Sequence, residues 1–171
     1  MRVRWVLDDG PLGVLASVVP LPVFLSWPSD LFAIAKPTWD AFVQSSHATK
    51  AGFVRDCRMQ VFDIVLGGEA SHMLFTHLRA DPASKAGANL AEHMAIAWLA
   101  HEQRTAQLVT TDKRAFYLAS AELGACRVAH ACDVWDWLFE QGLFDMIVRL
   151  EAVRLTMKSA NMSVPYRYSR H

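Results

Sequence analysis

The feature that most constrains the fold is an alternation of short apolar runs with longer stretches of helical pattern. The β-prone runs end at acids, glycines or turn signals, as the run at residues 3–7 ends at Asp8. This alternation favours a parallel sheet covered on both faces by helices. We therefore predict an α/β fold, a three-layer α/β/α sandwich with a central, mainly parallel sheet. The predicted strands are residues 3–7, 59–66, 107–110 and 126–130.

Helices are predicted from capping signals and periodicity. Ser29 and Asp30 have the character of N-cap residues, which favours a helical turn within residues 28–35. Pro37 and Thr38 then open a helix through about residue 49. Residues 88–100 are rich in alanine and apolar almost all round, so this helix should be largely buried. Further helices are predicted at residues 12–18, 69–79, 112–121, 133–140 and 144–158.

Composition excludes several classes of protein. The chain of 171 residues is 53% hydrophobic and 20% charged, which excludes a disordered protein and fits a single domain. Its 17 basic and 17 acidic residues give no net charge, so it has no broad positive field for gripping nucleic acid. A polyanion would have to be held locally. The three cysteines, Cys57, Cys126 and Cys132, form no CxxC pair, which favours a reducing cytoplasm.

The apolar segment at residues 11–27 needs separate consideration. Pro11, Pro20 and Pro22 interrupt it, and it is too short to cross a bilayer. Asp8 and Asp9 also stand where a signal peptide would carry positive charge. We expect no membrane span and a cytoplasmic location.

Three acids are placed to converge. In an open parallel sheet, ligands bind outside the carboxyl ends of the strands, near the point where strand order reverses. Asp8 ends the first predicted strand, and Asp112 follows the strand closed by Val109 and Thr110. Glu92 begins the Ala-rich helix on its polar flank. The sequence therefore predicts that these three carboxylates meet.

Crowded carboxylates raise one another's pKa unless a cation neutralises them. Oxygen ligands suit Mg²⁺ or Mn²⁺, which keep several waters and accept phosphate oxygens. Such ions lower the pKa of a bound water and stabilise the charge on a leaving oxygen. The predicted chemistry is phosphodiester hydrolysis without a covalent intermediate.

The same residues carry a family resemblance. The run Val6-Leu7-Asp8-Asp9-Gly10-Pro11-Leu12 resembles the opening strand of PIN-domain nucleases. The segment from Ala91 to Ala100 is similar to the family's acid-led, Ala-rich helix, and the segment from Leu108 to Phe116 resembles its strand, hydroxyl and Asp signature. The resemblance covers roughly residues 1–140 and is most specific from Leu90 to Phe116. It implies a PIN-like nuclease domain at 1–140, with residues 141–171 as a C-terminal helix and tail packed on the same domain.

The resemblance also implies roles for single residues. Asp8, Glu92 and Asp112 match the family's first, third and fourth acids, which bind Mg²⁺ or Mn²⁺, and Thr110 matches the hydroxyl that supports the last acid. Asp40 matches the second catalytic acid, although a Glu is usual there. The implied function is a metal-dependent ribonuclease. Because unstacked strands can thread an acidic crevice and the neutral overall charge does not suit gripping a long duplex, we expect single-stranded or loop RNA as its substrate, with DNA as the alternative. Some members are toxins paired with a small antitoxin protein, although typical toxins are shorter than this chain. Members often pair as homodimers.

Other interpretations of these residues stay open. Asp9 is a second ligand or a capping residue, and Asp112 is a ligand or only an N-cap. Lys113 and Arg114 either solvate their helix or clamp the scissile phosphate. The spacings of the histidines, five between His72 and His77 and eight between His93 and His101, do not match a helical zinc pair.

Other classes of function also stay open. The acid pair with Lys113 faintly resembles a phospho-acceptor receiver domain, but a receiver gives the acid-led, Ala-rich helix no role. A PIN-like module that binds RNA or protein without catalysis fits the sequence as well. Trp98, Trp135 and Trp137 lie at helical positions typical of a core or an interface. The apolar surplus of the two terminal helices predicts a homodimer.

Overall fold

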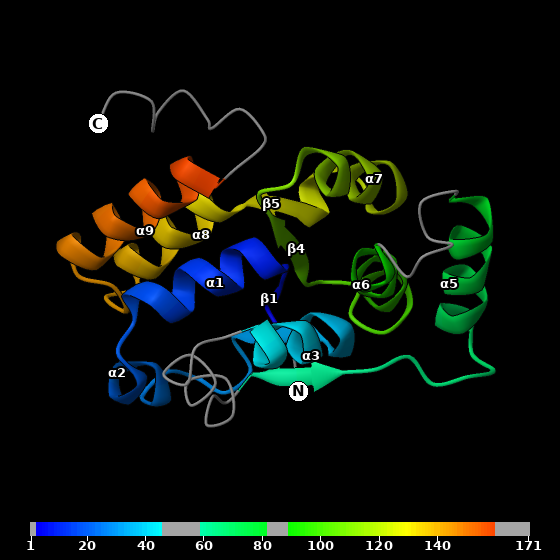
Figure 1. Cartoon of the computed structure of the whole chain (residues 1–171), viewed down its shortest axis with the longest axis horizontal. Helices are drawn as coiled ribbons and strands as arrows, with labels where there is room; N and C mark the ends of the chain where they lie inside the picture. Colours follow the sequence, from blue (N-terminus) through cyan, green and yellow to red (C-terminus); the bar gives the residue numbers. More distant parts are fainter. Residues whose placement is uncertain (1–2, 46–58, 82–88, 160–171) are drawn as a thin grey trace.

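A computed structural model of the protein describes residues 3–45, 59–81 and 89–159. The five strands of the described residues form one sheet in the order β3-β2-β1-β4-β5, and every pairing is parallel. Helices cover both faces (Figure 1). The predicted three-layer α/β/α sandwich is confirmed. The strands are β1 (Trp5–Leu7), β2 (Phe32–Ala35), β3 (Gln60–Phe62), β4 (Gln107–Thr110) and β5 (Val128–His130).

One face of the sheet is covered by helices from the two ends of the chain, which lie side by side in Figure 1. Trp5 and Leu7 of β1 turn to this face, and Val6 between them turns to the other, as the period of a strand requires. The core here is bulky and aromatic, with Trp135 fully buried. The helices are α1 (Asp9–Val18), α8 (Ala131–Glu140) and α9 (Met146–Ser159), with the short α2 (Leu21–Leu25) beside them.

The other face is covered by α5 (Glu69–Ala80), α6 (Leu90–His101) and α7 (Lys113–Leu123). Its core is built largely from alanines, with Trp98 of α6 stacked on Phe62 of β3. Small side chains allow α6 to lie close to the sheet, and residues 93–99 are all buried. The remaining helix, α3 (Lys36–Ser45), follows β2 and contacts both α1 and α6.

One local prediction was wrong. Residues 32–35 form strand β2 rather than a helical turn, because all four are buried between β1 and β3. Tertiary burial outweighs the capping signal of Ser29 and Asp30, which lie in the preceding turn. The helix predicted to stop before Pro20 does end at Val18, and the short α2 follows it, with Pro22 in its first turn. The predicted end of α3 near residue 49 lies outside the described residues.

Strand order reverses between β1 and β4. The chain leaves β1 toward β2 on one side, and β4 later adds on the other side. The carboxyl ends of β1 and β4 therefore border the crevice where open α/β sheets bind their ligands. In the part of the chain that the structure describes, no helix is long and apolar enough to span a membrane.

Candidate functional site

A pocket of about 400 Å³ lies at this switch point. Four elements meet there: the end of β1, the start of α3, the start of α6 and the residue before α7. Three of the predicted acids, Asp8, Glu92 and Asp112, line it. The full lining is Asp8, Asp9, Pro37, Thr38, Ala41, Asn89, Leu90, Ala91, Glu92 and Asp112.

Asp8 is held by two hydrogen bonds at the end of β1. The Thr110 hydroxyl donates to its Oδ2 (2.7 Å), and the Asp9 amide donates to its Oδ1 (2.9 Å). Burial raises the pKa of Asp8, the charges of Asp9 and Asp112 raise it further, and the two hydrogen bonds act in the opposite direction. A fixed carboxylate with a raised pKa is one that a nearby cation would stabilise.

Glu92 lies in the first turn of α6. Burial, followed by the charge of Asp8, raises its pKa to about 7. Its Oε2 is buried and accepts no hydrogen bond from the described residues. A buried carboxylate oxygen without a donor is unfavourable unless it is protonated or meets a cation. Glu92 therefore has the electrostatic character expected of a ligand or an acid–base group, and its role stays a prediction.

Asp112 is both an N-cap and a pocket residue. Its Oδ1 accepts a hydrogen bond from the Ala115 amide (2.9 Å), which caps α7. Its charge also contributes to the raised pKa values of Asp8 and Glu92. The capping interpretation is confirmed, and it leaves the proposed metal role open.

Thr110 joins the two strand ends. It donates to Asp8 and accepts a hydrogen bond from the Asp112 amide (3.0 Å). The family resemblance implied that the Thr110 hydroxyl supports Asp112. In the structure this hydroxyl contacts the backbone amide of Asp112 and the side chain of Asp8. Because Thr110 is fully buried, its hydroxyl has a fixed orientation.

Gly10 is a further residue that shapes the pocket. A Cβ at this position would lie 2.7 Å from Thr111 Oγ1. The first turn of α1 can therefore lie close to the strand end that carries Asp112 only if residue 10 has no side chain. A glycine in the first turn of a predicted helix was the available signal.

Asp40 does not line the pocket. It forms an ion pair with Lys36 one turn earlier on α3 (2.9 Å), and both side chains are about half exposed. Thr38 and Ala41 of the same helix do line the pocket. Asp40 is thus near the candidate site but not directed into it, and its catalytic role stays a prediction.

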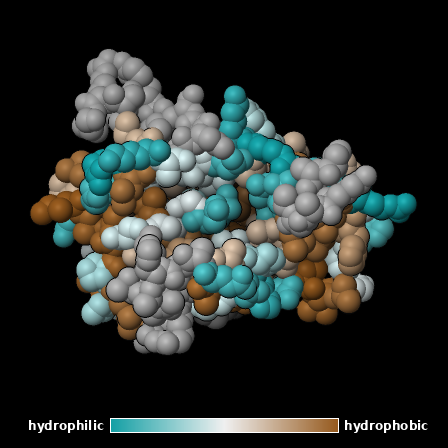
Figure 2. All heavy atoms as spheres, viewed as in Figure 1, coloured by the Kyte–Doolittle hydropathy of each residue, from teal (hydrophilic) through white to brown (hydrophobic). Residues whose placement is uncertain are grey.

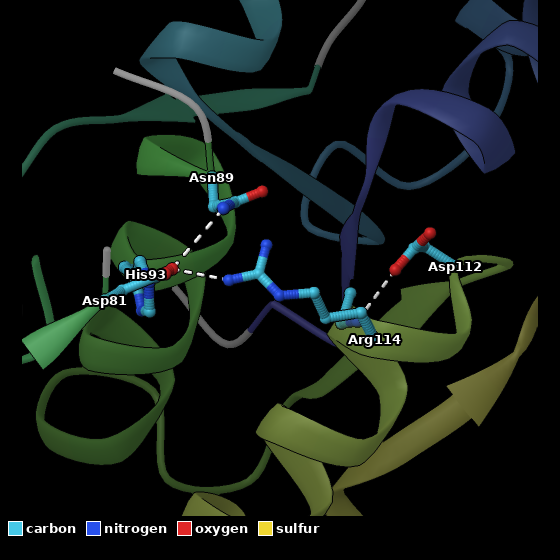
Figure 3. Close-up of polar contacts among 6 residues, drawn as sticks. Asp81, Asn89, His93, Asp112 and Arg114 are labelled. Carbon is cyan, nitrogen blue, oxygen red and sulfur yellow. Dashed lines mark hydrogen bonds and ion pairs between the residues drawn. The ribbon is translucent and has the colours of Figure 1, made fainter. Parts of the chain in front are cut away.

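The two basic residues of the motif lie differently. Lys113 is exposed at the first position of α7. Arg114 extends away from Asp112 and reaches Asp81 at the end of α5 (Figure 3). Its charge lowers the pKa of Glu92, against the larger effect of burial. Arg114 therefore influences the acids without lining their pocket.

Asp81 is the residue that the sequence did not single out. Its Oδ2 accepts hydrogen bonds from Arg114, from Asn89 Nδ2 (3.3 Å) and from the ring nitrogen Nε2 of His93 (3.0 Å). Figure 3 shows these side chains directed toward one another from α5, α6 and α7. The network ties the beginning of α6, which carries Glu92, to the beginning of α7.

The donor set fits Mg²⁺ or Mn²⁺. Among the described residues no three His, Cys, Asp or Glu side chains form a ready-made metal cluster. Mg²⁺ needs few protein ligands, because it retains several waters and takes one or two carboxylates. The unpartnered oxygen of Glu92 and the mutual repulsion of the acids are both features that a cation would relieve.

Comparison with protein-family models, curated protein sequences and solved structures finds no match. The function must therefore be argued from the site, because the fold alone hosts many chemistries.

Proposed function

We propose that the protein is a divalent-metal-dependent ribonuclease that cleaves single-stranded or loop RNA. The observation that carries the proposal is the meeting of Asp8, Glu92 and Asp112 at one pocket of the switch point. Two of the three have raised pKa values, as groups at functional sites often do. Structural ion pairs do not explain these shifts, since burial is the largest cause of both.

Each residue has a defined part in this proposal. Asp8, Glu92 and Asp112 would hold Mg²⁺ or Mn²⁺, which when bound supplies an activated water and neutralises a leaving oxygen. Thr110 fixes Asp8, and Gly10 lets the two strand ends approach. Lys113, exposed at the start of α7, would contact a phosphate near the acids.

RNA in single strands is the substrate class that the charge balance favours. The chain carries no net charge, so it lacks the overall positive charge that suits gripping a long duplex. An unpaired strand bends readily and presents its phosphates one at a time to a local site.

The direct test is cleavage of a single-stranded oligoribonucleotide with Mg²⁺, Mn²⁺ or EDTA. Asp8→Asn and Asp112→Asn should each reduce cleavage at least 100-fold, because each removes a carboxylate nearest the reacting phosphate. Asp63→Asn is the matched control, since Asp63 follows β3 as Asp8 follows β1 but does not line the pocket. Near-normal activity of Asp8→Asn would exclude this site.

A second candidate is a PIN-like module that binds RNA or protein without catalysis. The observation that favours it is the lack of a ready-made metal cluster among the described residues. The same assay separates the two. RNA binding that persists with every divalent ion tested, with no cleavage product, would support the binding module and exclude the nuclease.

Self-association is a further part of the proposal. Most apolar residues of the terminal helices are buried in the core or pack, partly buried, against it, and those left exposed lie in the first half of α9: Met146, Ile147 and Leu150. Figure 2 shows an apolar patch over this end of α9, at the left of the view. We expect a homodimer through this patch, or a small antitoxin protein seated on it.

Light scattering tests the dimer. Ile147 is 79% exposed, so Ile147→Asp should leave the fold intact and convert a dimer to a monomer. Trp137 and Phe144 are unsuitable positions because they pack against the core. A mass near 19.1 kDa at every concentration of the unmodified chain would exclude the dimer.

A further inference from the structure

A second pocket, of about 630 Å³, lies between α5, α6 and α7. Its lining combines flat rings with polar groups: Tyr117, His77 and His93 with Arg114 and Glu122. Tyr117 is 62% exposed, and its ring meets that of Phe116 edge-on at 6.1 Å, which gives it a supported orientation. An exposed, oriented aromatic ring beside a cavity is a surface on which another flat ring can stack.

The two histidines of this pocket carry buried polar atoms without partners. Nδ1 of His77 and Nδ1 of His93 are both buried, and neither forms a hydrogen bond with the described residues. The two rings meet edge-on at 5.5 Å. Nε2 of His93 lies 3.0 Å from Oδ2 of the Asp81 carboxylate, which leaves Nδ1 as the ring nitrogen for a further partner. Buried polar groups of this kind usually have a partner, such as a water or a ligand.

Neighbouring residues of the chain line this second pocket and the pocket of the acids. Asn89 lines the acid pocket and donates to Asp81, which lines the second one. Glu92 lines the first pocket and His93, the next residue of α6, lines the second. Likewise, Asp112, the N-cap of α7, lines the first pocket, and Arg114, two residues later, lines the second. A strand whose phosphate lay at the acids would therefore have a neighbouring nucleotide within reach of the second pocket.

We infer that the pocket between α5 and α7 binds a nucleobase next to the phosphate held at the acid pocket, with Tyr117 as its stacking platform. The inference rests on the proposed function for the identity of the ligand as RNA. Arg114 is held by Asp81, is half exposed and lines the second pocket, two residues after Asp112 of the acid pocket. It would contact the backbone between the phosphate and the base. The pocket thus makes binding depend on the base as well as on the phosphate.

Binding without cleavage isolates this inference. Fluorescence anisotropy would measure the affinity of the full chain, in Mg²⁺, for a labelled five-residue oligoadenylate whose phosphorothioate linkages resist hydrolysis and for the same oligomer with abasic riboses. Loss of one base–aromatic stack weakens binding about tenfold. We expect Tyr117→Ala to weaken oligoadenylate binding by about that factor and to leave abasic binding unchanged. Tyr117→Phe, which keeps the ring, should bind normally.

Phe75→Ala is the matched control, because Phe75 is also an exposed aromatic, at 56%, but lines neither pocket. Unchanged affinity of Tyr117→Ala, or equal affinity of the abasic and normal oligomers, would overturn the inference. Equal losses in Tyr117→Ala and Phe75→Ala would also overturn it. If Tyr117 and the bases matter but the unmodified chain never cleaves RNA, the base pocket stands and the nuclease proposal fails.

Discussion

The two faces of the sheet are built differently. The face under α1, α8 and α9 is aromatic, and its buried polar pair is satisfied: Trp135 Nε1 donates to Thr156 Oγ1 (2.9 Å), which donates to the Ala152 carbonyl. The face under α5, α6 and α7 is packed with alanine. Among the described residues, most of the buried side-chain polar atoms without a hydrogen-bond partner lie in the helices of that second face, in His77, Glu92, His93 and Ser120.

This difference separates stability from function. The first face gains from large buried side chains, and its buried Trp135 and Thr156 are hydrogen-bonded to each other, as in a structural core. The second face has small side chains, mainly alanine, so that α6 lies close to the sheet. It also retains buried polar groups, and their burial is unfavourable when no ligand is bound. Groups left unpaired in this way are expected where a ligand completes them. We therefore expect substitutions on the first face to change stability most, and substitutions near the acids to change function most.

The largest effect on stability should come from Trp135→Ala. Trp135 is fully buried in the aromatic face, and removing it leaves a cavity and unpairs Thr156. We expect the free energy of unfolding to fall by about 3–5 kcal/mol, measured by urea denaturation. The pocket of the acids should be unaffected at temperatures where the variant is folded. A loss below about 1 kcal/mol would mean that this face is not the stabilising one.

Gly10→Ala should have the next largest effect, because Gly10 stands where the two faces meet. Its added Cβ would lie 2.7 Å from Thr111 Oγ1, so α1 or the strand end must move. We expect about 1–3 kcal/mol of destabilisation, and a loss of cleavage larger than the loss of stability explains. Gly13→Ala, in the same helix with open space around it, should be neutral or stabilising by up to about 1 kcal/mol. Equal behaviour of the two variants would contradict the close approach.

Glu92→Gln tests whether the second face is destabilised by its own acids. The pKa of Glu92 is raised from 4.5 to about 7, so the folded state binds its proton more tightly than the unfolded state does. The folded state therefore loses stability as the pH rises from about 4.5 through about 7. The Gln variant has no ionisable group at this position and does not lose this stability. A shift of this size corresponds to about 3 kcal/mol, but solvent screening of a half-buried group reduces the expected gain to about 1 kcal/mol.

The measurement is the melting temperature of both proteins in metal-free buffer at pH 4 and pH 8. We expect Glu92→Gln to be more stable at pH 8 and equal at pH 4. Saturating Mg²⁺ should reverse the difference at pH 8, since an ion that binds only the unmodified folded site stabilises it. If the difference in melting temperature between the two proteins does not change with pH, ionisation of Glu92 does not destabilise the fold.

The sequence predicted the parts of the fold that have strong local signals. Gln107–Thr110 was predicted with its observed ends, and the acids at the ends of β1 and β4 line one pocket because parallel strands share an edge. Strand β2 was missed because its four residues follow a turn with capping signals. The Asp81 network joins Arg114, 33 residues away, to Asn89 and His93. Such a pairing depends on how α5 packs on α6, which no short spacing reveals.

The smallest effect should come from Lys36→Ala on α3, outside the pocket. An exposed pair at i and i+4, like Lys36 and Asp40, contributes about 0.3–0.5 kcal/mol, and high salt screens it.

Asp40→Asn breaks the same ion pair and should cost about as much stability. The cleavage activity of this variant decides whether Asp40 is the second acid. If Asp40 acts on the metal through water, cleavage should fall about tenfold, well short of the loss in Asp8→Asn. Lys36→Ala keeps the carboxylate and should retain full activity, so it separates loss of the pair from loss of the acid. Unchanged cleavage in both variants would remove Asp40 from the site, and a loss in Asp40→Asn as large as in Asp8→Asn would mean that α3 turns this side chain toward the pocket during catalysis.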